Sequence, residues 1–447
     1  MFKDTIFALS SARGKSALSV YRLSGPDSIN IIQNLTNSNI LFEHKKIQKV
    51  KLFDQITKNT KEIIDEVLIA YFKAPHSFTG EDVIEIYAHG SPAVAKSLTE
   101  NVLNNKNVRY AAAGEFTKRA VLNSKMDLVS AEGLIDLINS ETSIQKKQAI
   151  NQMTSKPFDK IEKLRDDLLE ILSLVEAYID FPDEEIPEST IENAQEKIQR
   201  IQEVLEKVLQ DKNKGERIRE GIKLVIYGKP NVGKSSLINY LTKRNVAIVS
   251  DISGTTRDSL ESHIDINGYP ITIIDTAGIR ENSQDKIEQE GIKLARNHIQ
   301  AADIKIFLQD VLHQKIEFEE DKFTINVINK VDIINNTEDN IDHDLKSEDF
   351  IAVSITENIG LNKLIKKIEE LASICAGNGE DVVITRTRQR SSIENAKKAI
   401  DDVNLRADLV LAAEDLRIAT RELSILFGKV DVEEILDRVF SQFCIGK

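Results

Sequence analysis

The sequence contains only two cysteines in 447 residues, Cys375 and Cys444. Two thiols cannot form a disulfide framework, which argues against a small disulfide-stabilised secreted domain and makes a reducing cytoplasm the expected location. Cys444 lies three positions before the end of the sequence, where chains usually fray. The residues by themselves leave open whether this thiol belongs to a functional site or only ends a terminal helix.

Long apolar runs and an excess of positive charge are also missing. No stretch approaches the ~18–20 apolar residues of a membrane-spanning helix, and residues 1–15 lack the features of a secretory signal, so no membrane association is expected. The formal net charge of −13 argues against a wholly basic nucleic-acid binder. Two local basic runs, 45–51 and 386–390, are interpreted as solvated surface in preference to contacts with a phosphate backbone.

The hydrophobic period changes several times along the chain. Alternating β-branched and aromatic residues at 16–23, 66–73 and 82–89 predict strands. A helical period predicts a long helix over 158–180 and a later helix whose apolar stripe runs from Leu405 to Leu426 and ends at Gly428. Between these helical parts, strands and helices alternate as in a mostly parallel sheet. The predicted fold class is therefore α/β plus all-α, with an α/β domain inserted into a helical domain. The predicted domains are 1–116, 117–214, 215–375 and 376–447.

The inserted region begins with an apolar strand followed by Gly228-xxxx-Gly233-Lys234-Ser235. This is the pattern of a phosphate-binding loop, in which backbone N–H groups and a helix N-terminus face the phosphates. Lys234 is expected to reach the outer phosphates and Ser235 to ligate Mg²⁺. A glycine turn at a strand end would explain the glycines alone, but not the motifs that follow.

Three later motifs complete a guanine-nucleotide site. Thr256 can reach Mg²⁺ when a γ-phosphate is present, and Asp275, at the end of an apolar strand, can hold the water shell of the metal. The carboxylate of Asp332 can accept hydrogen bonds from two guanine donors that adenine lacks. The expected GTP-binding residues are Asn231, Val232, Gly233, Lys234, Ser235, Ser236, Ser250, Asp251, Ile252, Ser253, Gly254, Thr255, Thr256, Asp275, Thr276, Ala277, Gly278, Asn329, Lys330 and Asp332.

A glutamine that many small GTPases use to orient the attacking water is absent. Its place after Gly278 is taken by Ile279. Hydrolysis is therefore expected to need another acidic or basic group, or a cation in place of an arginine finger. Several acidic residues, Glu288 among them, follow on the same segment, and most of them are expected to form a solvated helix face.

Taken together and in order, the motifs resemble those of the MnmE (TrmE) family of tRNA-modification GTPases. The resemblance covers the whole chain and rests on "DTIFALSS", "VYRLSGP", "SFTGEDVIEIYAHGS" (77–91), "GEFTKRAVLNSKMDL" (114–128), "VEAYIDFPDEEI" (175–186), the GTPase motifs and the terminal "FCIGK". It implies an N-terminal folate-binding domain that forms a homodimer, and a helical domain split by a Ras-like P-loop GTPase domain. It also implies that the chain, with a flavin-dependent partner, installs an aminomethyl-type (carboxymethylaminomethyl) group at C5 of the wobble uridine of certain tRNAs.

The same resemblance implies roles for individual residues. The contacts to 5-formyltetrahydrofolate would be Arg22, Glu85, Lys125 and Lys447. The ligands of a potassium ion would be Asn231, Ser250, Ile252 and Thr255, and those of Mg²⁺ would be Ser235 and Thr256. Glu288 would help to position the attacking water, and Cys444 would take part in the modification.

Two other functions stay open from the residues alone. A GTP-switch factor for ribosome assembly shares every motif of the G domain, but it usually carries a basic RNA-binding module that this acidic chain does not show. A folate-dependent transferase regulated by GTP is the third alternative. Folate-binding assays and nucleoside analysis of tRNA separate the three.

Overall fold

The structure is a computed structural model, and it describes residues 2–37, 40–56, 62–154, 156–181, 187–244, 261–275, 296–311, 317–336, 349–379, 382–430, 436, 439–441, 443 and 446. Contacts divide the chain into two compact units, Met1–Ile135 with Ser424–Lys447, and Asp136–Leu423. Among the helices in these described ranges, none is long and apolar enough to cross a membrane.

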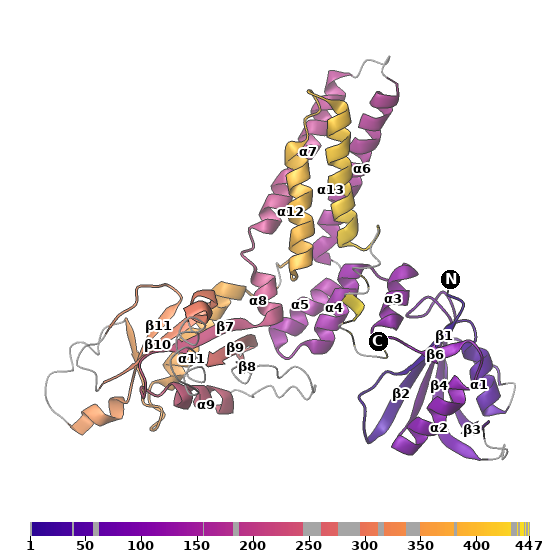
Figure 1. The fold of residues 1–447 in the computed structure, drawn as a ribbon, viewed down its shortest axis with the longest axis horizontal. Coiled ribbons are helices and arrows are strands. Elements are labelled where there is room, and N and C mark those ends of the chain that lie inside the picture. The colour runs from indigo at the N-terminus through magenta and orange to yellow at the C-terminus, as the bar shows by residue number, and fades with distance from the viewer. Residues whose placement is uncertain are drawn as a thin grey trace, which may run out of the picture. The chain divides into compact units, whose positions relative to one another are not determined.

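The first unit is built on a mixed sheet with the strand order β3-β4-β5-β2-β1-β6, in which only the β1–β6 pair is parallel. Because successive side chains point to opposite faces of the sheet, Tyr21 and Ile86 lie in a core that two helices close (Figure 1). Their neighbours Arg22 and Glu85 lie on the other face. The elements are β1 (Thr5–Leu9), β2 (Ser16–Ser24), α1 (Ser28–Thr36), β3 (Ile47–Phe53), β4 (Ile63–Phe72), β5 (Val83–Gly90), α2 (Pro92–Leu103), β6 (Val108–Tyr110) and α3 (Glu115–Leu122). The strands predicted at 16–23, 66–73 and 82–89 are confirmed as β2, β4 and β5.

Long helices form the part of the second unit that flanks the insertion. The helix predicted over 158–180 is confirmed as α6 (Asp159–Asp180), whose buried face includes Ile161, Leu168 and Val175. Helices α6, α7 and α12 run side by side with α13 (Figure 1). The bounds of these and the neighbouring helices are α5 (Ser143–Met153), η1 (Lys156–Phe158), α7 (Glu188–Leu209), α12 (Thr387–Asp402) and α13 (Leu409–Leu426). Helix α4 (Leu128–Asn139) begins in the first unit and ends in the second.

The last long helix begins later than the apolar stripe predicts. Helix α13 starts at Leu409, because the Asp408 carboxylate accepts hydrogen bonds from the N–H groups of Val410 (2.9 Å) and Leu411 (3.3 Å). Leu405 lies in the turn before this helix start and is nevertheless buried. The prediction that the helix extends back to Leu405 is therefore wrong, whereas its end before Gly428 is confirmed.

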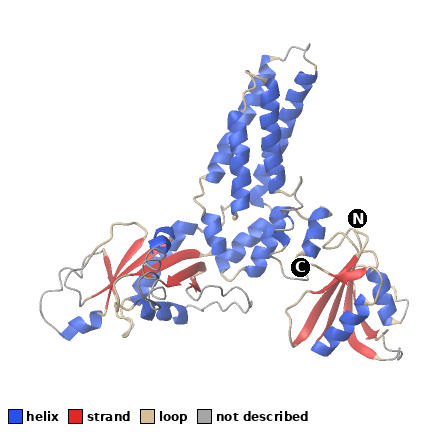
Figure 2. Ribbon diagram, viewed as in Figure 1, coloured by secondary structure: helices blue, strands red, loops and turns tan. Residues whose placement is uncertain are grey.

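The inserted part of the second unit contains a second sheet, with the order β12-β11-β10-β7-β9-β8. All neighbouring pairs are parallel except β8–β9, which agrees with the predicted alternation of strands and helices. Both sheets appear in red, with their helices in blue, in Figure 2. The elements are α8 (Lys214–Glu220), β7 (Ile222–Tyr227), α9 (Lys234–Arg244), β8 (Glu261–Ile266), β9 (Tyr269–Asp275), β10 (Ile304–Asp310), β11 (Thr324–Asn329), η2 (Val331–Asn336), β12 (Phe350–Ala352) and α11 (Leu361–Ala376).

Ion pairs join α12, which follows the insertion, to α8, to the segment just before α8 and to α4. Arg390 on α12 donates to Glu216 at 2.8 and 3.0 Å and to Asp211 at 2.7 Å. The hydrogen bonds to Glu216 contribute most to raising the pKa of Arg390 above its usual range. Arg386 in the same basic run pairs with Asp136 at 2.6 Å. The interpretation of residues 386–390 as solvated surface is therefore wrong for Arg386 and Arg390.

Arg390→Met is expected to lower the free energy of unfolding by ~3 kcal/mol, because it leaves two largely buried carboxylates without their cation. The matched control on the same helix is Lys397→Met, which removes a more exposed pair with Glu206 and is expected to change stability by less than ~1 kcal/mol. Urea unfolding of both variants measures the difference. Equal losses would contradict the structural role of the Arg390 pairs.

Candidate functional site

The phosphate-binding loop lies between β7 and α9, and its two glycines are required by close contacts. A Cβ on Gly228, whose φ is +148°, would lie 2.0 Å from the carbonyl oxygen of Leu308. A Cβ on Gly233, whose φ is +105°, would lie 2.4 Å from Nδ2 of Asn329. The loop therefore packs against the ends of two neighbouring strands, β10 and β11, and its own residue Val232 is fully buried.

Polar groups that suit phosphate gather at the start of α9. Lys234 Nζ bends back over the loop and donates to the carbonyl oxygens of Gly228 (3.2 Å) and Lys229 (2.8 Å). Ser235 and Ser236 follow in the first turn of the helix and are exposed. The N–H groups of a first helical turn have no partner within the helix, so they are available to an anion, and the helix dipole favours negative charge there.

The guanine motif is held against the same loop. The side chain of Asn329 donates to the carbonyl oxygen of Val232 at 2.9 Å, and Lys330 Nζ donates to that of Asn231 at 2.9 Å. Asp332 Oδ1 is shielded from solvent and has no hydrogen-bond partner among the described residues. An acceptor that lacks donors in this position fits the N1–H and 2-amino groups of guanine.

Asp275 lies on the same edge of the sheet as the phosphate-binding loop. It ends β9 and is in register with Ile226 of the parallel strand β7, two residues before Gly228. The structure thus brings together the predicted residues Asn231–Ser236, Asp275, Asn329, Lys330 and Asp332 at the carboxyl ends of parallel strands. The remaining predicted residues, Ser250–Thr256, Thr276–Gly278 and Glu288, lie outside the described residues.

Arg22 and Glu85, two of the four predicted folate contacts, form a direct ion pair. They stand opposite each other on β2 and β5, and Arg22 donates to Glu85 Oε1 from Nε (3.1 Å) and Nη2 (2.7 Å). The other carboxylate oxygen accepts a hydrogen bond from the Tyr87 hydroxyl at 2.7 Å. Burial and this hydrogen bond raise the pKa of Tyr87 to about 12, so the phenol stays a donor at neutral pH. Sequence reasoning missed Tyr87.

The loop before β5 links Lys125 to this ion pair. A Cβ on Gly80 would lie 3.1 Å from Cε of Lys125, while the guanidinium carbon of Arg22 lies 5.3 Å from the ring centre of Phe78. Arg22, which pairs with Glu85, and Lys125 therefore both lie beside the segment 78–80. Lys447, the fourth predicted contact, lies outside the described residues.

The C-terminal segment packs within the first unit. Phe440 and Phe443 are buried in a cluster with residues of α3 and α4, and Ser10 Oγ donates to the carbonyl oxygen of Gly446 at 2.8 Å. A hollow of about 530 Å³ lies beside the segment, with Phe440, Ser441 and Arg119 among its lining residues. Cys444 lies outside the described residues, and the described residues on either side of it, Phe443 and Gly446, belong to this unit.

Cys375, the other cysteine, has the properties of a structural residue. It is buried near the end of α11, in the core beneath the inserted sheet. Burial, followed by the charge of Asp303, raises the pKa of its thiol to about 11. Since the thiolate is the nucleophile, a thiol with a raised pKa is a poor one at neutral pH.

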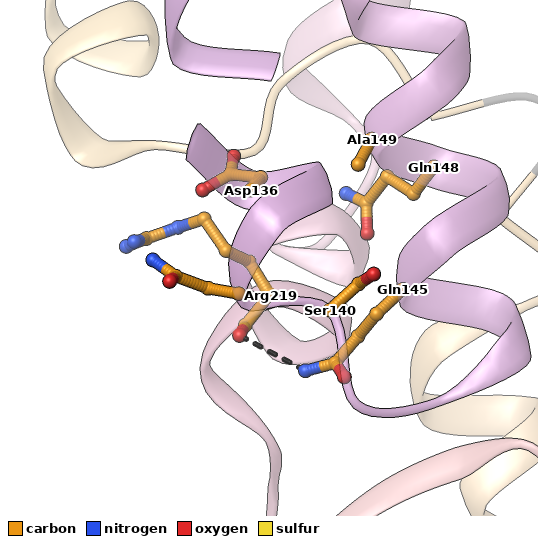
Figure 3. A pocket seen from close by; sticks show the side chains of 7 residues that line it. Asp136, Ser140, Gln145, Gln148, Ala149 and Arg219 are labelled. Atoms are coloured by element: carbon orange, nitrogen blue, oxygen red, sulfur yellow. Dashed lines mark hydrogen bonds between the residues drawn. The ribbon is translucent and has the colours of Figure 1, made fainter. Parts of the chain in front are cut away.

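A polar pocket lies between α4, α5 and α8 (Figure 3). The side chain of Gln145 crosses it and donates to the carbonyl oxygen of Arg219 at 3.3 Å, and Asp136, Ser140 and Gln148 also line it. Its volume of about 120 Å³ is well below the ~300–1,000 Å³ of ordinary ligand sites. It is therefore too small for a nucleotide or a folate.

The mostly parallel sheet, the phosphate-binding loop and the guanine motif define a GTP-binding domain of the P-loop GTPase class. The family model described as "MnmE helical domain" matches residues 128–444, and the one described as "GTP-binding protein TrmE N-terminus" matches residues 5–125. The chain belongs to the MnmE (TrmE) family of tRNA modification GTPases.

Full-length relatives agree with these matches. The chain is 47% identical to the tRNA modification GTPase MnmE of Rickettsia rickettsii (strain Sheila Smith), over 99% of this chain and 100% of the relative. It is also 47% identical to the protein of that name from Orientia tsutsugamushi (strain Boryong), over 100% of each. Among solved structures, the G domain of the T. maritima FeoB iron transporter is 25% identical with a TM-score of 0.24, covering 34% of this chain and 98% of that chain.

Proposed function

We propose that the chain couples GTP hydrolysis to the installation of a carboxymethylaminomethyl-type group at C5 of the wobble uridine of certain tRNAs, together with a flavin-dependent partner protein. The proposal includes a cytoplasmic homodimer and the domain boundaries predicted after residues 116, 214 and 375. The guanine site supports GTP binding, since the buried Oδ1 of Asp332 has no donor among the described residues and lies beside the phosphate-binding loop. Membership in the family supports the tRNA part.

Metal ions would sit beside the phosphates in this proposal. Ser235 at the start of α9 and Thr256 would hold Mg²⁺, a hard cation that takes oxygen ligands, and Asp275 stands at the neighbouring strand end. Asn231 would hold a potassium ion with Ser250, Ile252 and Thr255. The exposed position of Asn231 on the loop, with its backbone carbonyl fixed by Lys330, is compatible with that role.

A tetrahydrofolate derivative would bind at Arg22, Glu85, Lys125 and Lys447 and supply the one-carbon unit. The pair of Arg22 and Glu85 fits a ligand that carries both a carboxylate tail and pterin N–H donors, because a guanidinium binds carboxylates and a carboxylate accepts from N–H groups. Lys125, which lies beside Gly80 in the loop before β5, adds a second cation nearby.

A reconstituted reaction tests the proposed function. The full chain is mixed with its flavin-dependent partner, unmodified tRNA, GTP, a tetrahydrofolate donor and the remaining substrates, and the digested nucleosides are analysed by mass spectrometry. We expect a modified wobble uridine with GTP and none when a non-hydrolysable analogue replaces it. Equal product with the analogue would contradict the coupling to hydrolysis.

GTP turnover is expected to be much faster in KCl than in NaCl at equal ionic strength. Ile279 cannot orient water, so a monovalent cation near Asn231 would supply the positive charge that an arginine finger supplies in other GTPases. Glu288→Ala should slow turnover without weakening GTP binding. Phosphate-release rates in the two salts provide the measurement, and equal rates would count against the cation site.

A further inference from the structure

Asp310 is an acidic residue beside the nucleotide loop that the sequence motifs do not include. It ends β10 and its side chain is only 5% exposed. Its Oδ2 accepts a hydrogen bond from Lys330 Nζ at 2.7 Å. The register of β10 with β11 places it directly opposite Asn329, the first residue of the guanine motif.

Lys330 connects this carboxylate to the phosphate-binding loop. The same ammonium group that donates to Asp310 also donates to the carbonyl oxygen of Asn231 at 2.9 Å. Asn231 has a φ of +66°, a left-handed conformation that is uncommon outside glycine but that asparagine adopts more readily than most residues. Such a conformation persists where surrounding contacts hold it in place.

We propose that Asp310 is a positioning residue for nucleotide binding, which acts by holding the ammonium of Lys330 on the carbonyl of Asn231. The guanine motif and the phosphate-binding loop would then be joined before the nucleotide arrives. Nucleotide binding would therefore cost less conformational entropy. This role needs only GTP binding by the loop, and it does not depend on potassium, folate or tRNA.

A carboxylate suits this role better than a neutral group. An ammonium ion is a compact, strongly hydrated charge on a flexible stem, and a charged acceptor holds it more strongly than a neutral one does. An asparagine at position 310 would keep the shape of the side chain but lose the charge. Lys330 would then be free to turn toward solvent, and the carbonyl of Asn231 would lose its donor.

Asp310→Asn in the full chain is the direct test. We expect the dissociation constant for GDP, measured with a fluorescent GDP analogue, to rise about tenfold, the usual effect of losing one charge-assisted hydrogen bond. The matched control is Asp321→Asn. Asp321 pairs with Lys305 at 2.9 Å beside the opposite ends of β10 and β11. This control should bind GDP within about twofold of the original chain.

Thermal melting without nucleotide separates positioning from general stability. A weaker affinity at an unchanged melting temperature supports the proposal, and a loss of affinity that accompanies a lower melting temperature contradicts it. A double-mutant cycle gives the second readout. In a Lys330→Met background, Asp310→Asn should cause no further loss of GDP affinity, because the ammonium group that it positions is gone. A double variant whose loss equals the product of the two single losses would overturn the proposal. Failure of the unaltered chain to bind GDP would instead overturn the nucleotide site itself.

Discussion

Cys444→Ser is expected to abolish the wobble-uridine modification while leaving GTP hydrolysis and folding nearly intact. Phe443 and Gly446, on either side of the cysteine, lie within the first unit, and Ser10 fixes the carbonyl of Gly446 there. If a folate binds at Arg22 and Glu85 as proposed, this prediction requires the thiol to reach its one-carbon unit. The cation of Lys447 would favour the reactive thiolate. Serine keeps the size of the side chain but provides no comparable nucleophile.

The measurement is the modified-nucleoside content of tRNA from cells whose only copy of the protein carries the variant. Cys375→Ser is the matched control and should retain the full content, because Cys375 is buried in the core of the inserted domain with a raised pKa. Full modification in the Cys444→Ser cells would show that this thiol only ends a terminal helix.

Asp332→Asn is expected to weaken GTP binding roughly 10- to 100-fold, which corresponds to the ~1.5–3 kcal/mol of a charge-assisted hydrogen bond. Its Oδ1 is buried and lacks a partner among the described residues, so guanine is the donor that it fits. Asparagine offers one acceptor and one donor in that place. The donor suits the carbonyl that xanthine carries where guanine has its amino group, so the variant should accept xanthosine triphosphate.

Titrations with both nucleotides check this change of base preference. The original chain should bind GTP tightly and xanthosine triphosphate weakly, and the variant should reverse or level that order. An unchanged GTP affinity in Asp332→Asn would remove Asp332 from the guanine site.

The helices and strands could be predicted because the spacing of their apolar residues is visible within a short stretch of sequence. Apolar residues recur every three to four positions along α6, and this spacing predicted a helix over 158–180, within one residue of its observed start at Asp159. The same rule extended α13 too far, since Leu405 is buried in a turn and periodicity does not distinguish a buried turn residue from a helical one. The N-cap at Asp408 decides the start.

The candidate site was predictable where parallel strand ends meet on one edge. That geometry explains why Asn329 and Lys330 contact the loop that begins about 100 residues earlier. Asp310 could not be predicted in the same way, because a single acidic residue at the end of a strand forms no motif. The basic run 386–390 was misread for a related reason, since the carboxylates that pair with Arg390 lie more than 170 residues away in the sequence.

The nucleoside content of tRNA from cells that lack this chain tests the proposed function most directly, with ribosomal subunit profiles measured in the same cells. We expect the wobble modification to disappear, to return when the unaltered gene is restored, and to stay absent with Asp332→Asn at ordinary GTP levels, while the subunit profiles stay normal. A full complement of modified wobble uridine together with an abnormal subunit profile would contradict the tRNA function and favour a GTP-switch factor of ribosome assembly.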